Sequence, residues 1–251
     1  LASSISHPLS NLDHIIIGTL TEPGAIDFTA MYSRAGVSRE GGDILSQVKN
    51  MSPEDKAVAM RVIHEEEEYG NQRMSLREDL YEFIHRIKAA RIRIGLSTRN
   101  SDIALQHFLQ KSELSASTFA TMLHRDSLGE INKPDPRVAF HILNEWDVSC
   151  STTGKDSGRA ESTCSSTVES TVGSSKGASS NSGATNSVDF GSSVGYVWFL
   201  GDSLDDMKCG KQAGCKTCLL KTPFNKGLES DSEWVDMAVD KLTDFTKNIG
   251  L

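Results

Sequence analysis

The sequence predicts an α/β fold: a doubly wound parallel sheet with a small all-helical insert. Short apolar runs of strand length alternate along the chain with segments whose apolar residues recur at helical spacing, a pattern typical of parallel sheets covered by helices. A polar segment at 23–70 carries helix signals, and it separates the first strand from the others. With 251 residues, the chain is long enough for one α/β domain and a small accessory unit.

Composition narrows the classes of partner. The chain has 26 basic and 34 acidic residues, a net charge of -8, so it offers no basic surface for nucleic acid. No apolar run approaches the roughly 20 residues that span a bilayer, and we expect a soluble protein, cytoplasmic or organellar, without a membrane partner. Monomer and homodimer both remain open. The chain begins at Leu1 rather than Met, so we expect that its N-terminus, and any targeting segment, is incomplete.

The first strand and the helical insert are predicted from local signals. The β-branched run Ile15-Ile16-Ile17 indicates a short buried strand. Within the insert, Ser52-Pro53-Glu54-Asp55 is a helix start, with a capping hydroxyl, proline at the first helical position and acids in the first turn. Gly70 is the expected end of that helix. The acidic run 65–68 is interpreted as a solvated helix face.

The rest of the chain alternates between helices and strands. The expected elements, in order, are a helix over 76–87, a strand over 92–96, a helix carrying Ile103 and Phe108, a strand over 119–123, a helix over 138–146, strands from Val194 and over 216–220, and a strand-to-helix passage over 240–245. Cys215-x-x-Cys218 has metal or redox spacing, but it leads into Leu219-Leu220. We therefore interpret it as part of a buried strand.

The stretch from Cys150 to Ser193 consists mainly of Ser, Thr and Gly. Such a segment buries too little apolar surface to offset its ordering entropy, so 150–193 is predicted to be a disordered surface insertion. Its hydroxyls could be phosphorylated; the alternative is a tolerated loop expansion without function. The expected domains are a core of 13–22 and 71–251, which includes this insertion, and the insert 23–70.

Two carboxylates mark a predicted ligand site. The apolar run that begins at Tyr196 ends at Gly201-Asp202, and Asp206 follows in helix-compatible sequence. Open α/β sheets bind ligands at the carboxyl ends of their strands. Asp202 and Asp206 are therefore predicted to hold a hard divalent cation through oxygen ligands. The alternative is that Asp202 caps the helix and Asp206 is a solvated first-turn acid.

Four polar clusters follow the predicted strands. In order they are Gly18-Thr19-Leu20-Thr21, Ser97-Thr98-Arg99-Asn100, Lys133-Pro134-Asp135-Pro136 and Gly201-Asp202-Ser203-x-x-Asp206-x-x-x-Gly210-x-x-Ala213-Gly214. Their order and spacing resemble the haloacid dehalogenase superfamily, in particular its phosphoglycolate-phosphatase-like branch with a small helical cap. The resemblance extends from Gly18 to Phe245, apart from the insertion. It implies a Rossmannoid core, with the 23–70 insert as the cap.

The resemblance implies a Mg²⁺-dependent phosphatase that hydrolyses a small phosphorylated metabolite, a phosphate monoester, through an aspartyl-phosphate. By the same resemblance, Thr98 binds the transferring phosphoryl group, with Arg99 and Asn100 in the same phosphate-binding cluster. Lys133 neutralises charge between nucleophile and phosphate. The acids at 202 and 206 hold Mg²⁺, and the cap closes over the site to exclude water and select the substrate.

The first motif departs from the family pattern. The family has Asp-x-Asp-Gly-Thr, in which the first Asp attacks phosphorus and the second protonates the leaving group. Here those positions are Ile15 and Ile17, which can do neither. Asp13 lies two residues upstream, about 6 to 7 Å further back along a strand, and is a poor substitute.

Two explanations remain open. The protein is a pseudophosphatase that binds a phosphate ligand or another protein, or the residues before Gly18 are not native, since the resemblance begins abruptly there. A dehalogenase, which shares the fold, is disfavoured because halide displacement has no need of Asp202 and Asp206. As written, the chain is expected to have little or no turnover. Ile15→Asp with Ile17→Asp is expected to restore some activity if the rest of the site is intact.

Overall fold

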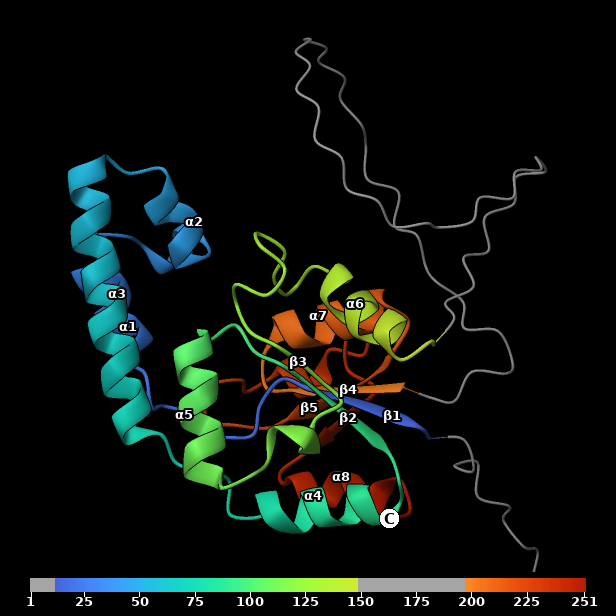
Figure 1. Cartoon of the computed structure of the whole chain (residues 1–251). Coiled ribbons are helices and arrows are strands. Elements are labelled where there is room, and N and C mark those ends of the chain that lie inside the picture. Colours follow the sequence, from blue (N-terminus) through green and yellow to red (C-terminus); the bar gives the residue numbers. More distant parts are fainter. Residues whose placement is uncertain (1–11, 149–196) are drawn as a thin grey trace, which may run out of the picture.

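A computed structural model describes residues 12–148 and 197–251 (Figure 1). The predicted insertion 150–193, with Cys150 and Cys164, lies outside the described residues, as does the predicted restart of the sheet at Val194.

The centre of the molecule is a sheet of six parallel strands in the order β3-β2-β1-β4-β5-β6. The strands are β1 His14–Ile17, β2 Arg93–Ser97, β3 Thr121–Leu123, β4 Val197–Gly201, β5 Lys216–Leu220 and β6 Met237–Val239. The isoleucine strand β1 lies between β2 and β4. Helices cover both of its faces, and this is why the central strands have continuous apolar sequences. The predicted doubly wound parallel sheet is confirmed.

Helices form a layer on each side of this sheet. They are α4 Leu80–Ala89, α5 Asp102–Ser112, α6 Arg137–Glu145, α7 Leu204–Gln212 and α8 Leu242–Asn248, and short 3-10 turns lie at Arg39–Gly41, Ala116–Thr118 and Leu228–Ser230. Figure 1 shows α4 and α8 on one side of the sheet and α6 and α7 on the other. Two apolar clusters, one on each side of the sheet, make up the main core.

The helix expected over 76–87 begins later, at Leu80. The residues before it are not helical: Glu22 N donates to Ser75 O (2.8 Å), Leu76 pairs with Thr21 across an isolated antiparallel bridge, and Glu78 and Asp79 form a turn. These backbone contacts join the chain leaving β1 to the chain returning to α4, and they leave the apolar face of α4 to start at Leu80.

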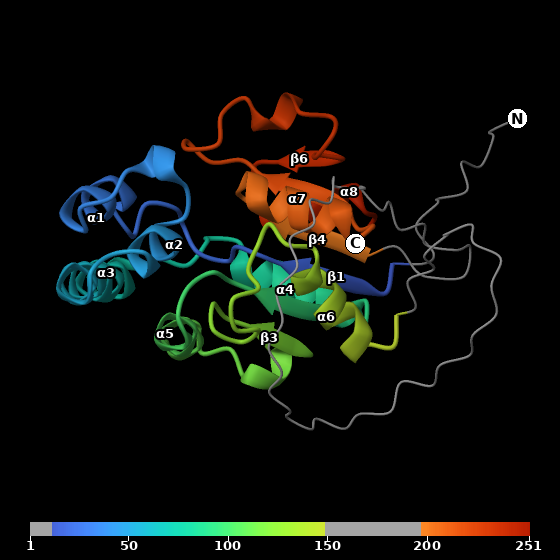
Figure 2. The same cartoon turned by 90° about the horizontal axis from the view of Figure 1, so that it is seen from above.

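Three further helices pack around a core of their own. They are α1 Phe28–Arg34, α2 Ile44–Lys49 and α3 Pro53–Arg73, and we call them the helical unit. Figure 2 shows them grouped apart from the sheet. The predicted start of α3 is confirmed: Ser52 is the N-cap, its hydroxyl accepts from Asp55 N at 3.1 Å, and Pro53 is the first residue of the helix.

The prediction that this helix ends at Gly70 is wrong. α3 continues to Arg73, and Gly70 lies buried inside it. A Cβ at position 70 would lie 2.4 Å from Cγ1 of Ile26, so glycine is needed where the chain entering α1 packs against α3.

The acidic run of α3 is also not the solvated face that we predicted. Glu65 and Glu66 pair with Arg34 of α1, and Glu66 is only 7% exposed. Glu67 pairs with Arg125, outside the helical unit. The run therefore ties α3 to its neighbours.

The cysteine pair lies where the strand interpretation placed it. Cys218 is in β5 and Cys215 directly precedes that strand, and both are buried. In the ranges 12–148 and 197–251, none of the helices has both the length and the apolar character that crossing a bilayer requires.

Candidate functional site

The carboxyl edge of the sheet brings Lys133 and Asp206 together. Lys133 lies in the connection before α6, and Asp206 lies in the first turn of α7. Lys133 Nζ donates to Asp206 Oδ1 at 2.6 Å and to the backbone oxygen of Ser97, the last residue of β2, at 2.8 Å. Both side chains are about 5% exposed or less. The edge therefore holds a buried ion pair that connects β2, α7 and the loop before α6.

Ser203 completes the environment of Asp206. The backbone N and Oγ of Ser203 donate to Asp206 Oδ2 at 3.2 and 2.6 Å, while Ser203 Oγ accepts from Asp206 N at 3.2 Å, a reciprocal cap of α7. Burial alone would raise the pKa of Asp206, but the charge and hydrogen bond of Lys133, with Ser203, hold that pKa below its usual value. The alternative that Asp202 caps the helix and Asp206 is solvated is wrong.

Asp202 follows β4 and has fewer partners. The Thr19 hydroxyl donates to Asp202 Oδ2 at 3.5 Å. Burial raises the pKa of Asp202 and the neighbouring Asp206 raises it further, while the charges of Arg77 and Lys133 oppose the rise. The Asp202 carboxylate is thus the less stabilised of the two as an anion.

The two aspartates do not form a cation site in this arrangement. A hard divalent cation takes about six oxygen ligands or more, and both oxygens of Asp206 already accept from Lys133 and Ser203. Only Asp202 of the predicted pair is available. Within the described ranges, there is no group of three or more His, Cys, Asp or Glu residues placed to hold a metal. The donor set therefore does not fit Mg²⁺ in this conformation.

Gly18, directly after β1, lies beside the Lys133–Asp206 ion pair. Gly18 N donates to Leu200 O at 2.6 Å and so continues the pairing with β4. A Cβ on Gly18 would lie 2.5 Å from Asp206 Oδ1 and 3.2 Å from Lys133 Nζ. Gly18, the residue directly after β1, therefore faces the ion pair.

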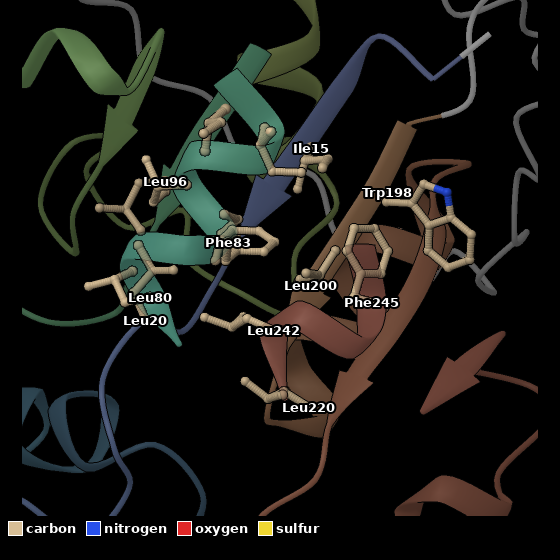
Figure 3. Close-up of a cluster of buried hydrophobic side chains, with 14 of the residues drawn as sticks. Ile15, Leu20, Leu80, Phe83, Leu96, Trp198, Leu200, Leu220, Leu242 and Phe245 are labelled. Carbon is tan, nitrogen blue, oxygen red and sulfur yellow. The ribbon is translucent and has the colours of Figure 1, made fainter. Parts of the chain in front are cut away.

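Ile15 and Ile17, which match the two acidic positions of the family motif, pack in the apolar core. Both are fully buried in the cluster between the sheet and α4 and α8. In Figure 3, Ile15 lies among the core side chains, near Phe83 of α4, with Trp198 and Phe245 in the same view. The strand register pairs Ile17 with Leu96 and Leu200, so all three sit on the same face of the sheet.

The predicted phosphate-binding residues separate into two pairs. Thr98 and Lys133 line one cavity together with Ser97, His124 and Asn132. Its volume is about 10 Å³, room for about one water molecule, so a phosphate enters only if the surrounding loops move.

Arg99 and Asn100 do not line that cavity. Arg99 Nη1 donates to Asp205 Oδ2 of α7 at 2.5 Å, and Asn100 donates its backbone N to Thr98 Oγ1 at 3.1 Å. Arg99 therefore spans from the end of β2 to α7, and Asn100 orients the Thr98 hydroxyl.

The helical unit contacts the loop that leads to Lys133. Arg125, between β3 and α6, pairs with Glu67 of α3, and both side chains are less than 20% exposed. Glu130 of the same loop pairs with the exposed Lys49. Sequence analysis missed these residues, because the partners lie 58 and 81 positions apart and no spacing rule connects them.

The chain is similar to known proteins in sequence and in structure. No family model matches the chain. A haloacid dehalogenase-like hydrolase domain-containing protein of Arabidopsis thaliana is 28% identical over 214 residues, 81% of this chain and 67% of that protein.

Solved structures share the architecture. A haloacid dehalogenase-like family hydrolase of Streptococcus pneumoniae superimposes with a TM-score of 0.60 at 11% identity, over 94% of this chain and 98% of its own. CbbY of Rhodobacter sphaeroides, solved in complex with phosphate, gives 0.58 at 15% identity, over 93% and 96%. A candidate phosphoglycolate phosphatase of Lactobacillus plantarum gives 0.56 at 14% identity, over 94% and 98%. At these identities, the structural likeness shows the fold.

Proposed function

We propose that this chain, which is similar to haloacid dehalogenase-like hydrolases in sequence and fold, binds a phosphate monoester at the carboxyl edge of the sheet and, as written, does not hydrolyse it. The observation that carries this proposal is Gly18. It directly follows β1 and faces Lys133 and Asp206, and it has no side chain with which to attack phosphorus.

The remaining side chains of the edge are suited to binding. Lys133 is a buried cation, and Thr98 supplies a hydroxyl in the same cavity. A phosphoryl group that displaced Asp206 from Lys133 would keep the ammonium paired with an anion, since charge-assisted hydrogen bonds to phosphate oxygens replace those to the carboxylate. The Thr98 hydroxyl would donate to a further oxygen.

The two aspartates are poor nucleophiles in this arrangement. Asp206 is held by Lys133 and Ser203, and the pKa of Asp202 is raised chiefly by burial, which favours its protonated form. Nucleophilic catalysis by a carboxylate needs an ionised group within reach of phosphorus. We infer that such a group is lacking at this edge among the described residues.

Inorganic phosphate tests the binding step. At constant ionic strength, phosphate should raise the melting temperature of the wild-type chain, because a ligand that binds only the folded state stabilises it. Lys133→Gln should remove most of that rise, and Lys49→Gln, which alters an exposed lysine elsewhere, should retain it. An equal rise in all three proteins would contradict binding at Lys133.

A second candidate is the Mg²⁺-dependent phosphatase itself, in a form of the protein with acids in its first motif. The convergence of Thr98, Lys133, Asp202 and Asp206 on one edge favours it. Peptide mass spectrometry of the protein from its natural source, directed at the segment ending in Gly18-Thr19-Leu20, distinguishes the two. Aspartates at the positions of Ile15 and Ile17 would support the phosphatase, and isoleucines would support the binding protein.

A further inference from the structure

A buried arginine in this protein lacks a hydrogen-bond partner at two nitrogens. Arg77 lies in the connection that returns from the helical unit to α4, and it is 7% exposed. Its Nε and Nη2 are withdrawn from solvent, and neither hydrogen bonds to any described residue. A buried charge without hydrogen bonds lowers the stability of the fold, so such groups are uncommon unless something else binds them.

The two unpartnered atoms belong to the same edge of the guanidinium. Nε and Nη2 point their N–H groups in parallel, the geometry that receives two oxygens of a carboxylate or a phosphate. A lysine ammonium, by contrast, is a compact point charge and has no such planar edge for two oxygens. The chemistry of this edge therefore favours an oxyanion.

Arg77 lines a pocket of about 200 Å³. Since one water occupies about 30 Å³ in the liquid, this is room for a small organic anion. The pocket lies where the connections to and from the helical unit meet the loops after β5 and β6. Its other lining residues include Glu22, Thr222 and Pro223.

The other cations of this pocket are already paired. Lys221 contacts Asp240 at 2.8 Å, and Lys241 lies 3.7 Å from Glu78. Asp79 also lines the pocket, and its Oδ2 accepts hydrogen bonds from the backbone N and the hydroxyl of Thr243. Among the described cations that line the pocket, Arg77 is the one without an ion pair.

The pocket is separate from the Thr98–Lys133 cavity but close to the same edge. No described residue lines both cavities. Asn225, in the loop after β5, donates to the backbone oxygen of Asp202 at 2.9 Å, and Arg77 N donates to Leu20 O at 3.4 Å. Arg77 thus lies at the junction of the helical unit with the sheet, and its charge opposes the rise in the pKa of Asp202.

We propose that this pocket is a second binding site, which takes a small molecule bearing a carboxylate or phosphate group, and that the Nε and Nη2 edge of Arg77 holds the oxyanion. Binding turns that edge of the guanidinium toward the cavity. The site goes beyond the phosphate site at Lys133, and it places a ligand against both connections between the helical unit and the sheet.

Nuclear magnetic resonance of the arginine Nε–Hε groups tests this directly. The Arg77 signal is assigned by its loss in Arg77→Lys, and the wild-type chain is titrated with acetate and with inorganic phosphate, with sodium chloride holding the ionic strength constant. We expect the Arg77 signal to move and saturate with at least one of the two anions. Movement with acetate alone identifies a carboxylate ligand, movement with phosphate alone a phosphate ligand, and movement with both a general oxyanion site.

The variant Lys133→Gln separates this site from the first one. The Arg77 signal should respond in Lys133→Gln as it does in wild type, whereas the Lys133-dependent part of the phosphate stabilisation is lost. If the proposed function is wrong, only the Lys133-dependent phosphate stabilisation would be missing, and the Arg77 signal would still respond. Loss of the Arg77 response in Lys133→Gln, while circular dichroism shows that variant to be folded, would overturn the second site.

Two further results would also overturn it. One is an Arg77 signal that follows chloride as closely as it follows acetate and phosphate. The other is an Arg77 signal that ignores all three anions but shifts in Glu22→Gln, which would show that an acid of the same pocket is its partner in solution. Lys241→Gln, which removes a cation from the same pocket, should leave the anion response of Arg77 in place.

Discussion

The carboxyl ends of β1 and β4 are hydrogen-bonded neighbours, yet they differ in what they bring to the site. β4 ends at Gly201 and is followed by Asp202 and the capped helix α7. β1 ends at Ile17 and is followed by Gly18. The two strands pair along the whole of β1 up to its carboxyl end, where Ile17 lies opposite Leu200. The pairing of these strands therefore does not depend on the carboxylates that chemistry would need.

The Lys133–Asp206 pair explains why the edge stays ordered without a β1 acid. Each member of the pair has a further hydrogen-bond partner. Lys133 donates to the backbone oxygen of Ser97, and Asp206 accepts from Ser203. The pair packs over Gly18 and Gly201, where any side chain would collide with Asp206. Retention of Lys133 and Asp206 is thus accounted for by folding alone, and it is weak evidence that phosphoryl transfer is still performed.

The largest expected effect comes from adding acids to β1. Ile15→Asp with Ile17→Asp places two unpaired carboxylates in a fully buried apolar cluster, at a cost of several kcal/mol each, against a total stability of about 5–15 kcal/mol. We expect circular dichroism to show that the double variant is unfolded. Ile15→Val with Ile17→Val should remain folded, with a loss of about 0.5–1.5 kcal/mol in unfolding free energy per substitution.

The sequence predicts that these acids restore some activity if the rest of the site is intact, whereas the burial of both side chains leads us to expect an unfolded variant. A folded, active double variant would show that β1 can shift its register to present residue 15 or 17 where Gly18 now lies.

Breaking the buried ion pair should have the next largest effect. Lys133→Met leaves the Asp206 carboxylate buried without its cation, and we expect a loss of about 3–5 kcal/mol in the free energy of urea unfolding. Lys49→Met removes an exposed pair with Glu130 and should change that free energy little. Similar losses in the two variants would mean that the Lys133 pair is not buried in solution.

Alanine substitutions compare the two strand ends directly. In Gly201→Ala, the new Cβ would lie 2.3 Å from Cβ of Asp206, which the helix backbone fixes, and we expect a loss of about 1–3 kcal/mol. In Gly18→Ala, the nearest atom is Asp206 Oδ1, at the tip of the side chain, so a smaller loss is expected. Urea unfolding of both variants measures the difference, and a larger loss for Gly18→Ala would contradict the packing described here.

The smallest effect concerns the pH dependence of the two aspartates. Because burial raises the pKa of Asp202 in the folded state, its ionised form costs stability above that pKa, and Asp202→Asn should raise the unfolding free energy at pH 7 in EDTA. The gain should shrink as pH falls through the folded pKa and vanish below the unfolded value of about 3.9.

Asp206→Asn should do the opposite. Its lowered pKa means that the ionised carboxylate contributes stability above the unfolded pKa, and that this contribution is lost as pH falls through the folded pKa. A stabilising Asp206→Asn at pH 7 would contradict the assignment of Lys133 as its partner.

Periodicity and end signals in the sequence were sufficient to predict the sheet and several helix boundaries. The run Ile15-Ile16-Ile17 is a buried strand, and Ser52-Pro53 begins α3. These predictions succeed because strand burial and helix capping depend on residues that are adjacent in the sequence.

The site depends on contacts that adjacent residues do not reveal. A motif alignment counts positions along β1, but pairing with β2 and β4 decides which side of the sheet each residue faces, and that pairing turns Ile15 to the core and Gly18 to the site. Likewise, the sequence predicts a helix end at Gly70, whereas the structure shows that a glycine is needed there because Ile26 packs against it. The bond between Glu67 and Arg125 has no local signal at all.

The central claim is that this chain lacks a working nucleophile at the end of β1. The most direct test is phosphate release from an aryl phosphate by the purified wild-type chain with Mg²⁺ present, beside an Asp202→Ala variant as the matched control. We expect no release above the background of the buffer in either protein. Mg²⁺-dependent turnover by the wild-type chain that Asp202→Ala abolishes would contradict the claim.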